Sequence, residues 1–91
     1  MNKQEMFEYI QGSWETQDDG EPQMTIVINE TEAIVDGSKS VISWNGTEDA
    51  WLIESGPRPI FLFPNENDSL STVTRKFGPK PAFSFIYHRI K

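Results

Sequence analysis

Few side chains in this 91-residue sequence have the types and spacing that catalysis or metal binding requires. His88 is the only histidine and cysteine is absent, so no group of nitrogen and sulfur ligands has the spacing of a zinc site. The serines include no nucleophile elbow, and the glycines stand singly at turns rather than in a phosphate-binding loop. The sequence therefore predicts a protein that is not an enzyme and that holds no metal and no cofactor.

A second group of side chains has the chemistry to bind a ligand rather than to transform one. Aromatic rings suit an apolar molecule, and a charged side chain among them would fix its polar group. The candidates to line a binding cavity are Trp44, Asp49, Trp51, Phe61, Phe63, Arg75, Phe85 and Tyr87. Asp49 has an alternative position at the rim of the fold, beside the turn predicted at residues 45–46.

Short strands separated by turn residues must position these side chains. After an opening strand at Trp14, alternating or apolar runs predict seven more, at residues 24–28, 32–35, 38–44, 47–54, 60–63, 70–75 and 82–90. The connections are short and none contains a helix, which favours an up-and-down antiparallel order. Closure into a barrel would remove the two unpaired edges of such a sheet. We therefore expect one domain over residues 1–91, mainly β, built as a small eight-stranded antiparallel barrel.

A short helix is predicted before the first strand. Asn2 and Glu5 have the spacing of a capping box, and the apolar side chains of Met6, Phe7 and Ile10 follow at helical spacing. A helix of about nine residues is marginal by itself, so its apolar stripe must dock on the strands. The mouth of the barrel is the expected docking place.

Two dipeptides predict tight hairpins and, with them, the inward face of the barrel. An Asp-Gly pair at residues 36–37 and an Asn-Gly pair at residues 45–46 are typical of two-residue turns, and the second turn would place Trp44 opposite Thr47. This register puts on one face Ala33, Val35, Ser38, Ser40, Ile42, Trp44, Thr47, Asp49, Trp51 and Ile53. Because the opposite face carries four charges, we expect this face to be the interior. Its polar members would then lie at the barrel rims, bond to one another, or line a wet cavity.

Charge is distributed unevenly along the chain. The net charge is −6, yet residues 1–54 carry twelve acidic and two basic side chains, whereas residues 55–91 carry two acidic and six basic ones. Neighbouring strands of the two halves could neutralise each other. The alternatives are an acidic patch that binds a basic partner and self-association of one half with the other, which leaves a homo-oligomer open.

Nucleic acid and membranes are not the expected partners. Basic residues near the C-terminus lie among phenylalanines, a pattern that can bind single strands by stacking, but a pI of about 4.6 opposes this function. The longest apolar run, residues 60–63, is far shorter than a membrane-spanning helix, and the N-terminus shows no secretory signal. We therefore expect a cytoplasmic protein.

The two ends of the chain together resemble a known family. Residues 9–14 (Tyr-Ile-Gln-Gly-Ser-Trp), where the helix leads into Gly-x-Trp, and residues 87–89 (Tyr-His-Arg) on the last strand are similar to the motif of the calycins, and among them of small lipocalin-like domains. The resemblance implies that the Arg89 guanidinium stacks on the Trp14 indole and closes one end of the barrel, which is a structural role. The strands are shorter than those of full lipocalins, and no C-terminal helix follows them.

Two functions are compatible with these observations. A lipocalin-like binding protein would hold a small apolar ligand in the barrel lumen. The alternative is a non-enzymatic interaction module, such as an inhibitor or accessory protein, with a filled barrel and an acidic surface that binds a protein partner. An eight-stranded barrel is wide enough either for its own side chains or for one small ligand, and short strands favour the filled state.

Overall fold

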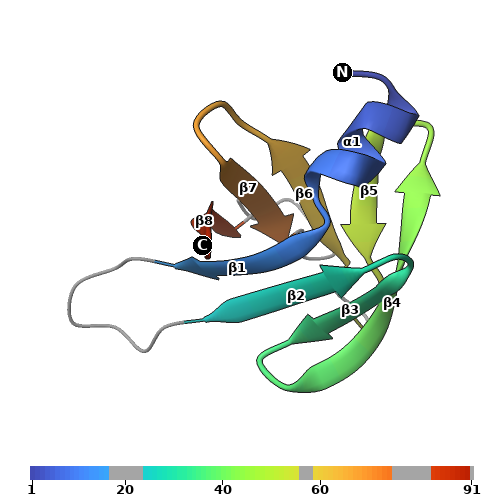
Figure 1. The fold of residues 1–91 in the computed structure, drawn as a ribbon. Helices are drawn as coiled ribbons and strands as arrows, with labels where there is room; N and C mark the ends of the chain where they lie inside the picture. Colours follow the sequence, from blue (N-terminus) through green and yellow to red (C-terminus); the bar gives the residue numbers. More distant parts are fainter. Residues whose placement is uncertain (17–23, 56–58, 75–82, 91) are drawn as a thin grey trace.

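The computed structural model describes residues 1–16, 24–55, 59–74 and 83–90, which form a barrel with a helix at one end (Figure 1). The elements are α1 (Lys3–Tyr9), β1 (Gly12–Thr16), β2 (Thr25–Asn29), β3 (Glu32–Val35), β4 (Ser38–Asn45), β5 (Ala50–Ile53), β6 (Ile60–Pro64), β7 (Ser69–Thr74) and β8 (Phe83–Arg89). All neighbouring strands pair antiparallel, and β8 pairs with β1, so the sheet closes on itself. The predicted fold class, a mainly β, up-and-down eight-stranded barrel with a short N-terminal helix, is confirmed.

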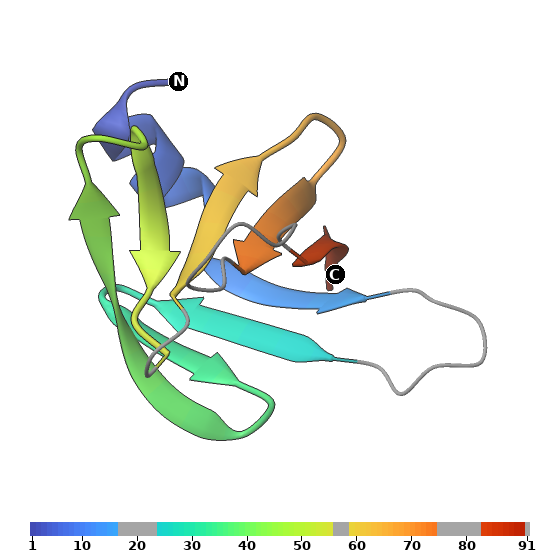
Figure 2. The ribbon, with the colours of Figure 1, turned by 180° about the vertical axis from the view of Figure 1, so that it is seen from behind.

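The helix lies over one end of the barrel, which we call the helix end. Asn2 Oδ1 accepts a hydrogen bond from Glu5 N at 2.8 Å, and Asn2 N donates to Glu5 Oε1 at 3.2 Å, so the predicted capping box is present. Figures 1 and 2, which view the molecule from opposite sides, both place α1 beside the start of β5. Phe7 packs against the barrel core, and Ile10, directly after the helix, is completely buried. The apolar stripe thus docks at the barrel end, as the shortness of the helix requires.

Inward side chains from the strands pack into one cluster. Strand β2 shows the alternation most clearly, because Ile26 and Ile28 are buried while Val27 between them is exposed. The cluster consists of Ile10, Trp14, Ile26, Ile28, Ala33, Ile42, Ile53, Leu62, Leu70 and Tyr87. It contains residues from both ends of the barrel, so a continuous apolar core holds the strands together.

The first predicted tight turn is correct. Asp36, with φ of +48°, and Gly37, with φ of +86°, join β3 to β4 and place Val35 opposite Ser38. Two consecutive positive φ angles are what a two-residue hairpin turn of the favoured hand requires.

The second predicted turn is wrong. Trp44 pairs with Trp51 rather than with Thr47, so β4 and β5 are joined by the four residues 46–49. The Asn45 side chain explains the longer turn, because its Oδ1 accepts hydrogen bonds from the backbone N–H groups of residues 47 and 48, both at 3.0 Å. The register moves by an even number of residues, and both tryptophans therefore stay on the inward face.

The polar residues predicted for the interior lie at the rims. Ser38, Thr47 and Asp49 are exposed, and the half-buried Ser40 donates from Oγ to the backbone oxygen of Glu54 at 2.5 Å. Asp49 occupies the 46–49 turn with φ of +55° and is exposed, so of its two predicted positions the rim is correct and the lumen is wrong. The longer turn is the reason, since it removes Asp49 from the strand.

Phe61 and Phe63 were predicted to line the lumen, and this prediction is also wrong. Trp51 pairs with Leu62, so Leu62 points into the barrel and its two phenylalanine neighbours point outward. There Phe61 forms a second cluster with Ala50 and Leu52, and the side chains of Phe63 and Val73 pack against it. Four consecutive apolar residues show no alternation, and the sequence therefore could not assign their faces.

Candidate functional site

Arg89 lies over Trp14 at the helix end of the barrel. The pairing of β1 with β8 places the two residues opposite each other, so both side chains start from adjacent inward positions. Arg89 Cζ is 4.3 Å from the centre of the Trp14 ring, within the range of a cation–π contact. The Trp14 side chain is fully buried, and its Nε1 donates to the backbone oxygen of Ile10 at 3.0 Å. The indole is therefore held by the guanidinium over its face and by a hydrogen bond at its edge.

The guanidinium also satisfies the end of the helix. Arg89 Nη1 donates to the Gln11 carbonyl and Nη2 to the Tyr9 carbonyl, both at 2.7 Å, while Nε forms an ion pair with Asp68 Oδ1 at 3.2 Å. The last carbonyls of a helix have no partner within it, and a cation near them is favourable. Gly12 allows this approach, because its φ is +116° and a Cβ there would lie 3.0 Å from Arg89 Nη1. Arg89 thus ties α1 to the last strand.

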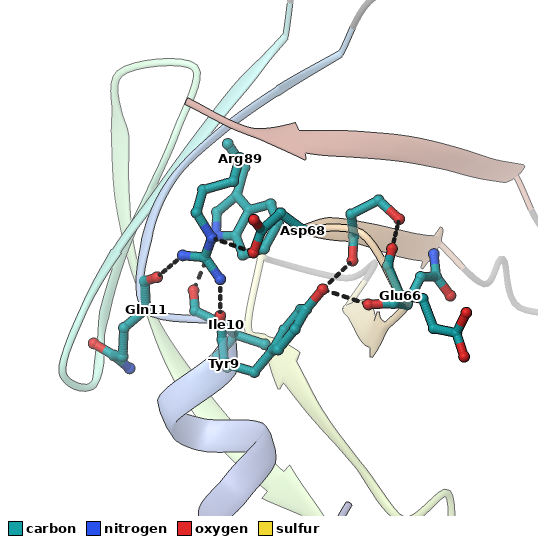
Figure 3. A network of polar contacts seen from close by, with 9 residues as sticks. Tyr9, Ile10, Gln11, Glu66, Asp68 and Arg89 are labelled. Carbon is teal, nitrogen blue, oxygen red and sulfur yellow. Dashed lines mark hydrogen bonds and ion pairs between the residues drawn. The ribbon is translucent and has the colours of Figure 1, made fainter. Parts of the chain in front are cut away.

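Tyr9 extends this network to the turn between β6 and β7 (Figure 3). Its hydroxyl donates to the backbone oxygens of Asn65 and Ser69, and its ring lies 5.9 Å from the ring of Trp14. The Arg89 guanidinium is 5.4 Å from the Tyr9 ring. The closure is therefore a network of α1, β1, β7 and β8, and its contacts give it a structural role.

A second aromatic cluster lies at the same end, where α1 meets the β4–β5 hairpin. The rings of Trp44 and Trp51 are 5.5 Å apart at an angle of 67°, and Phe7 of α1 packs 5.2 Å from Trp51. Lys3 Nζ lies 5.7 Å from the Trp44 ring and 5.6 Å from the Trp51 ring. Trp51 Nε1 donates to the Lys3 carbonyl at 3.0 Å. We call Trp44, Trp51 and the space that Lys3 occupies between them the tryptophan corner.

The other residues predicted to line the lumen do not lie at the tryptophan corner. Tyr87 points into the core and is 4% exposed, and this burial, with a smaller effect of Asp36, raises the pKa of its phenol to about 12. Phe85 lies on the inward side of β8 but near the opposite end of the barrel, where it is 37% exposed. Arg75 lies outside the described residues. The candidates named from the sequence therefore do not form one cavity lining.

The described part of the chain offers little for other chemistry. Within these residues, no three His, Cys, Asp or Glu side chains gather in a way that could hold a metal ion. Nor does any described helix have the length and apolar character needed to cross a membrane. Of the basic residues considered for nucleic acid, Arg89 is engaged in the closure, and residues 75, 76, 80 and 91 lie outside the described ranges.

Comparison with known proteins gives no relative: no family model, no curated protein and no solved structure matches this chain. The closed antiparallel barrel is compatible with a calycin-like fold. Membership of that superfamily stays an inference from residues 9–14 and 87–89.

Two participants at the helix end, Lys3 and Asp68, were not recognised from the sequence, and for Phe7 only its docking at the barrel mouth was predicted. Lys3 and Phe7 are four residues apart, which places them on one side of the helix, but no local pattern brings that side against Trp51. Asp68 belongs to a turn whose polar composition is typical of any loop, and only the fold brings it to Arg89.

Proposed function

We propose that the protein is a non-enzymatic interaction module whose barrel is filled by its own side chains and whose acidic outer surface binds a cationic protein partner. The observation that carries this proposal is the burial of the core. Six of its residues, from the helix end to the opposite end, have no accessible surface: Ile10, Trp14, Ile26, Ala33, Ile53 and Leu70. A water-sized space beside any of these side chains would give it accessible surface, so the packing leaves no such space next to them.

A dye titration tests the filled barrel. We expect an environment-sensitive apolar dye to show no saturable fluorescence increase and to take no energy from the tryptophans. A double variant with a smaller core, Ile26→Ala with Leu70→Ala, serves as the control because it creates an apolar space that can accept the dye. Stoichiometric dye binding that the unaltered protein shows and that Phe85→Ser retains would overturn the filled-barrel proposal.

The outer face of β2, β3 and β4 supports the choice of a cationic partner. Val41 lies between Glu32, its partner on β3, and Glu54, whose backbone N–H donates to the Val41 oxygen at 2.9 Å. Next to them, Val27 and Ile34 form an outward cross-strand pair. Val41 is 48% exposed, and both glutamates are exposed. Lys39, the partner of Ile34 on β4, is exposed on the same face, so the carboxylates flank the Val41 side of this apolar strip. That side complements a partner whose apolar contact residues are flanked by Lys or Arg. The name β2–β4 face is used below for Val27, Glu32, Ile34, Val41 and Glu54.

Binding of a synthetic basic amphipathic peptide of Lys and Leu tests this face by calorimetry. We expect an affinity that falls with added salt and that drops roughly fivefold in Glu32→Gln with Glu54→Gln, at about 0.5 kcal/mol for each charge. A matched control, Glu8→Gln with Glu66→Gln, makes the same charge change elsewhere on the surface and should bind as the unaltered protein does. Equal losses in both double variants would overturn the β2–β4 face as the binding surface.

One observation favours a second function, the binding of a small apolar ligand at the end of the barrel opposite α1. Phe85 is exposed there, and Met24, Val35 and Ile60 are half-buried side chains against the core. These residues could cover an apolar molecule without entering the packed core. Dye binding that is lost in Phe85→Ser but kept in Ile86→Ser, on the outer side of the same strand, would favour this function.

A further inference from the structure

The tryptophan corner has the geometry of a cation-binding site. Two indole rings lie 5.5 Å apart at an angle of 67°, and the Lys3 ammonium lies within 6 Å of both ring centres. Recognition of alkylated ammonium groups commonly uses aromatic rings arranged around the cation in this way. The corner therefore holds a cation of this chain in a position where another cation could be held.

The two rings are positioned independently of the Lys3 side chain. The β4–β5 register places Trp44 directly opposite Trp51 on the inward face. Trp51 is oriented further by its hydrogen bond to the Lys3 backbone oxygen and by the ring of Phe7. Removal of the Lys3 side chain keeps that backbone bond, so the corner is built before a ligand arrives.

The ammonium of Lys3, in contrast, is held weakly. Lys3 is exposed, and within the described residues no hydrogen bond or ion pair to its Nζ accompanies the two ring contacts. A primary ammonium is strongly hydrated and keeps its water at little cost. A trimethylammonium group has no N–H to hydrate and covers more of both rings, so it should displace Lys3 from the corner.

The long-range electrostatics favour the same ligand class. Residues 1–54, which include α1 and the β4–β5 hairpin, carry a net charge of −10. A negative potential of this kind raises the local concentration of cations. Both tryptophans are half-buried rather than enclosed, so a small cation can reach the corner once the Lys3 side chain swings away.

We propose that the tryptophan corner binds a trimethylammonium group and that Lys3 is its internal occupant in the free protein. The shared chemistry is that of choline and of Nε-trimethyllysine. The site lies at the helix end, apart from the β2–β4 face, and does not depend on the function proposed for that face.

Titration with choline and, separately, with Nε-trimethyllysine tests the proposal, followed by the indole N–H signals of Trp44 and Trp51 in NMR spectra. We expect saturable shifts, and binding about two- to fivefold tighter in Lys3→Ala, the factor that corresponds to a contact of 0.5–1 kcal/mol. The ligand that binds more tightly identifies the source as a free small molecule or a modified side chain. The neutral isostere of choline, 3,3-dimethyl-1-butanol, should not bind.

Two further variants keep the test decisive. Trp44→Leu should abolish choline binding while the protein remains folded, which the unchanged indole signal of Trp14 would report. Lys3→Arg, which keeps a cation in the corner, should bind choline no better than the unaltered protein. The proposal is overturned if choline gives no saturable shift in Lys3→Ala, if the neutral isostere binds equally well, or if folded Trp44→Leu still binds.

Discussion

Two cations, Arg89 and Lys3, lie over aromatic rings at the same end of this barrel, and their contacts differ in almost every physical respect. Arg89 is 4.3 Å from a completely buried indole and donates two hydrogen bonds of 2.7 Å to backbone carbonyls. Lys3 is more than 5.5 Å from two half-buried indoles, and its side chain is exposed. The first contact is shielded from water and joins α1 to the last strand, whereas the second is open to solvent.

The difference shows how one kind of interaction can serve structure in one place and binding in another. A half-buried guanidinium whose donors are paired cannot leave without depriving two backbone carbonyls of their donors. An exposed ammonium over half-buried rings leaves at little cost because water replaces the contacts that it loses. We therefore expect Arg89 to carry stability and Lys3 to be exchangeable. Substitutions at each of the two contacts test this contrast.

The largest effect is expected for Arg89→Ala. It removes the cation–π contact and leaves two carbonyls without their donor, and we expect a loss of about 2–4 kcal/mol of unfolding free energy. Urea denaturation followed by tryptophan fluorescence measures it. Arg89→Lys keeps the charge but not the planar guanidinium, so its unfolding free energy should lie between those of the original protein and Arg89→Ala. An Arg89→Ala protein as stable as the original would remove the structural role of the closure.

Gly12→Ala should have the next largest effect. A Cβ at this position would lie 3.0 Å from Arg89 Nη1 on a backbone with φ of +116°, so we expect a loss of about 1–3 kcal/mol in the same denaturation measurement. Gly37→Ala is the control for backbone strain alone, since its φ is +86° with no atom within 4 Å of the added carbon, and should cost about 1 kcal/mol. Equal losses would mean that crowding of Arg89 contributes nothing.

Lys3→Ala should lower stability by no more than about 1 kcal/mol, because the contact is exposed. Added salt should reduce this difference further, whereas the difference for Arg89→Ala should change less because the Trp14 ring beneath the guanidinium is buried. Denaturation of both variants at low and high salt checks this. If Lys3→Ala lowers the unfolding free energy as much as Arg89→Ala does, then Lys3 also has a structural role and the two contacts do not differ in this respect.

Gly46→Ala should have the smallest effect. Gly46 has no positive φ, and its added carbon would make an ordinary contact of 3.8 Å with Trp44 Nε1, so we expect a change within about 0.5 kcal/mol. Thermal unfolding of this variant beside Gly12→Ala compares one glycine at each cation–aromatic contact. A large loss in Gly46→Ala would show that the tryptophan corner is packed as tightly as the closure.

Much of the fold follows from local patterns in the sequence. Turn residues and alternation predict eight strands, the spacing of Asn2 and Glu5 predicts the helix cap, and the dipeptide at residues 36–37 predicts a turn that the structure contains. The register error at residues 45–46 came from a competing local preference, because the Asn45 side chain satisfies two backbone N–H groups of a longer turn.

By itself, the sequence determined the number and order of the elements and that Trp44 and Trp51 share a face, since strand period and turn chemistry act over a few residues. Only the tertiary structure decided that Phe61 points outward, because an apolar run has no period from which to read its faces. It alone also brought Lys3 to Trp51, 48 residues away. Which side of a short helix meets which strand depends on burial summed over distant segments, and that sum exists only in the folded barrel.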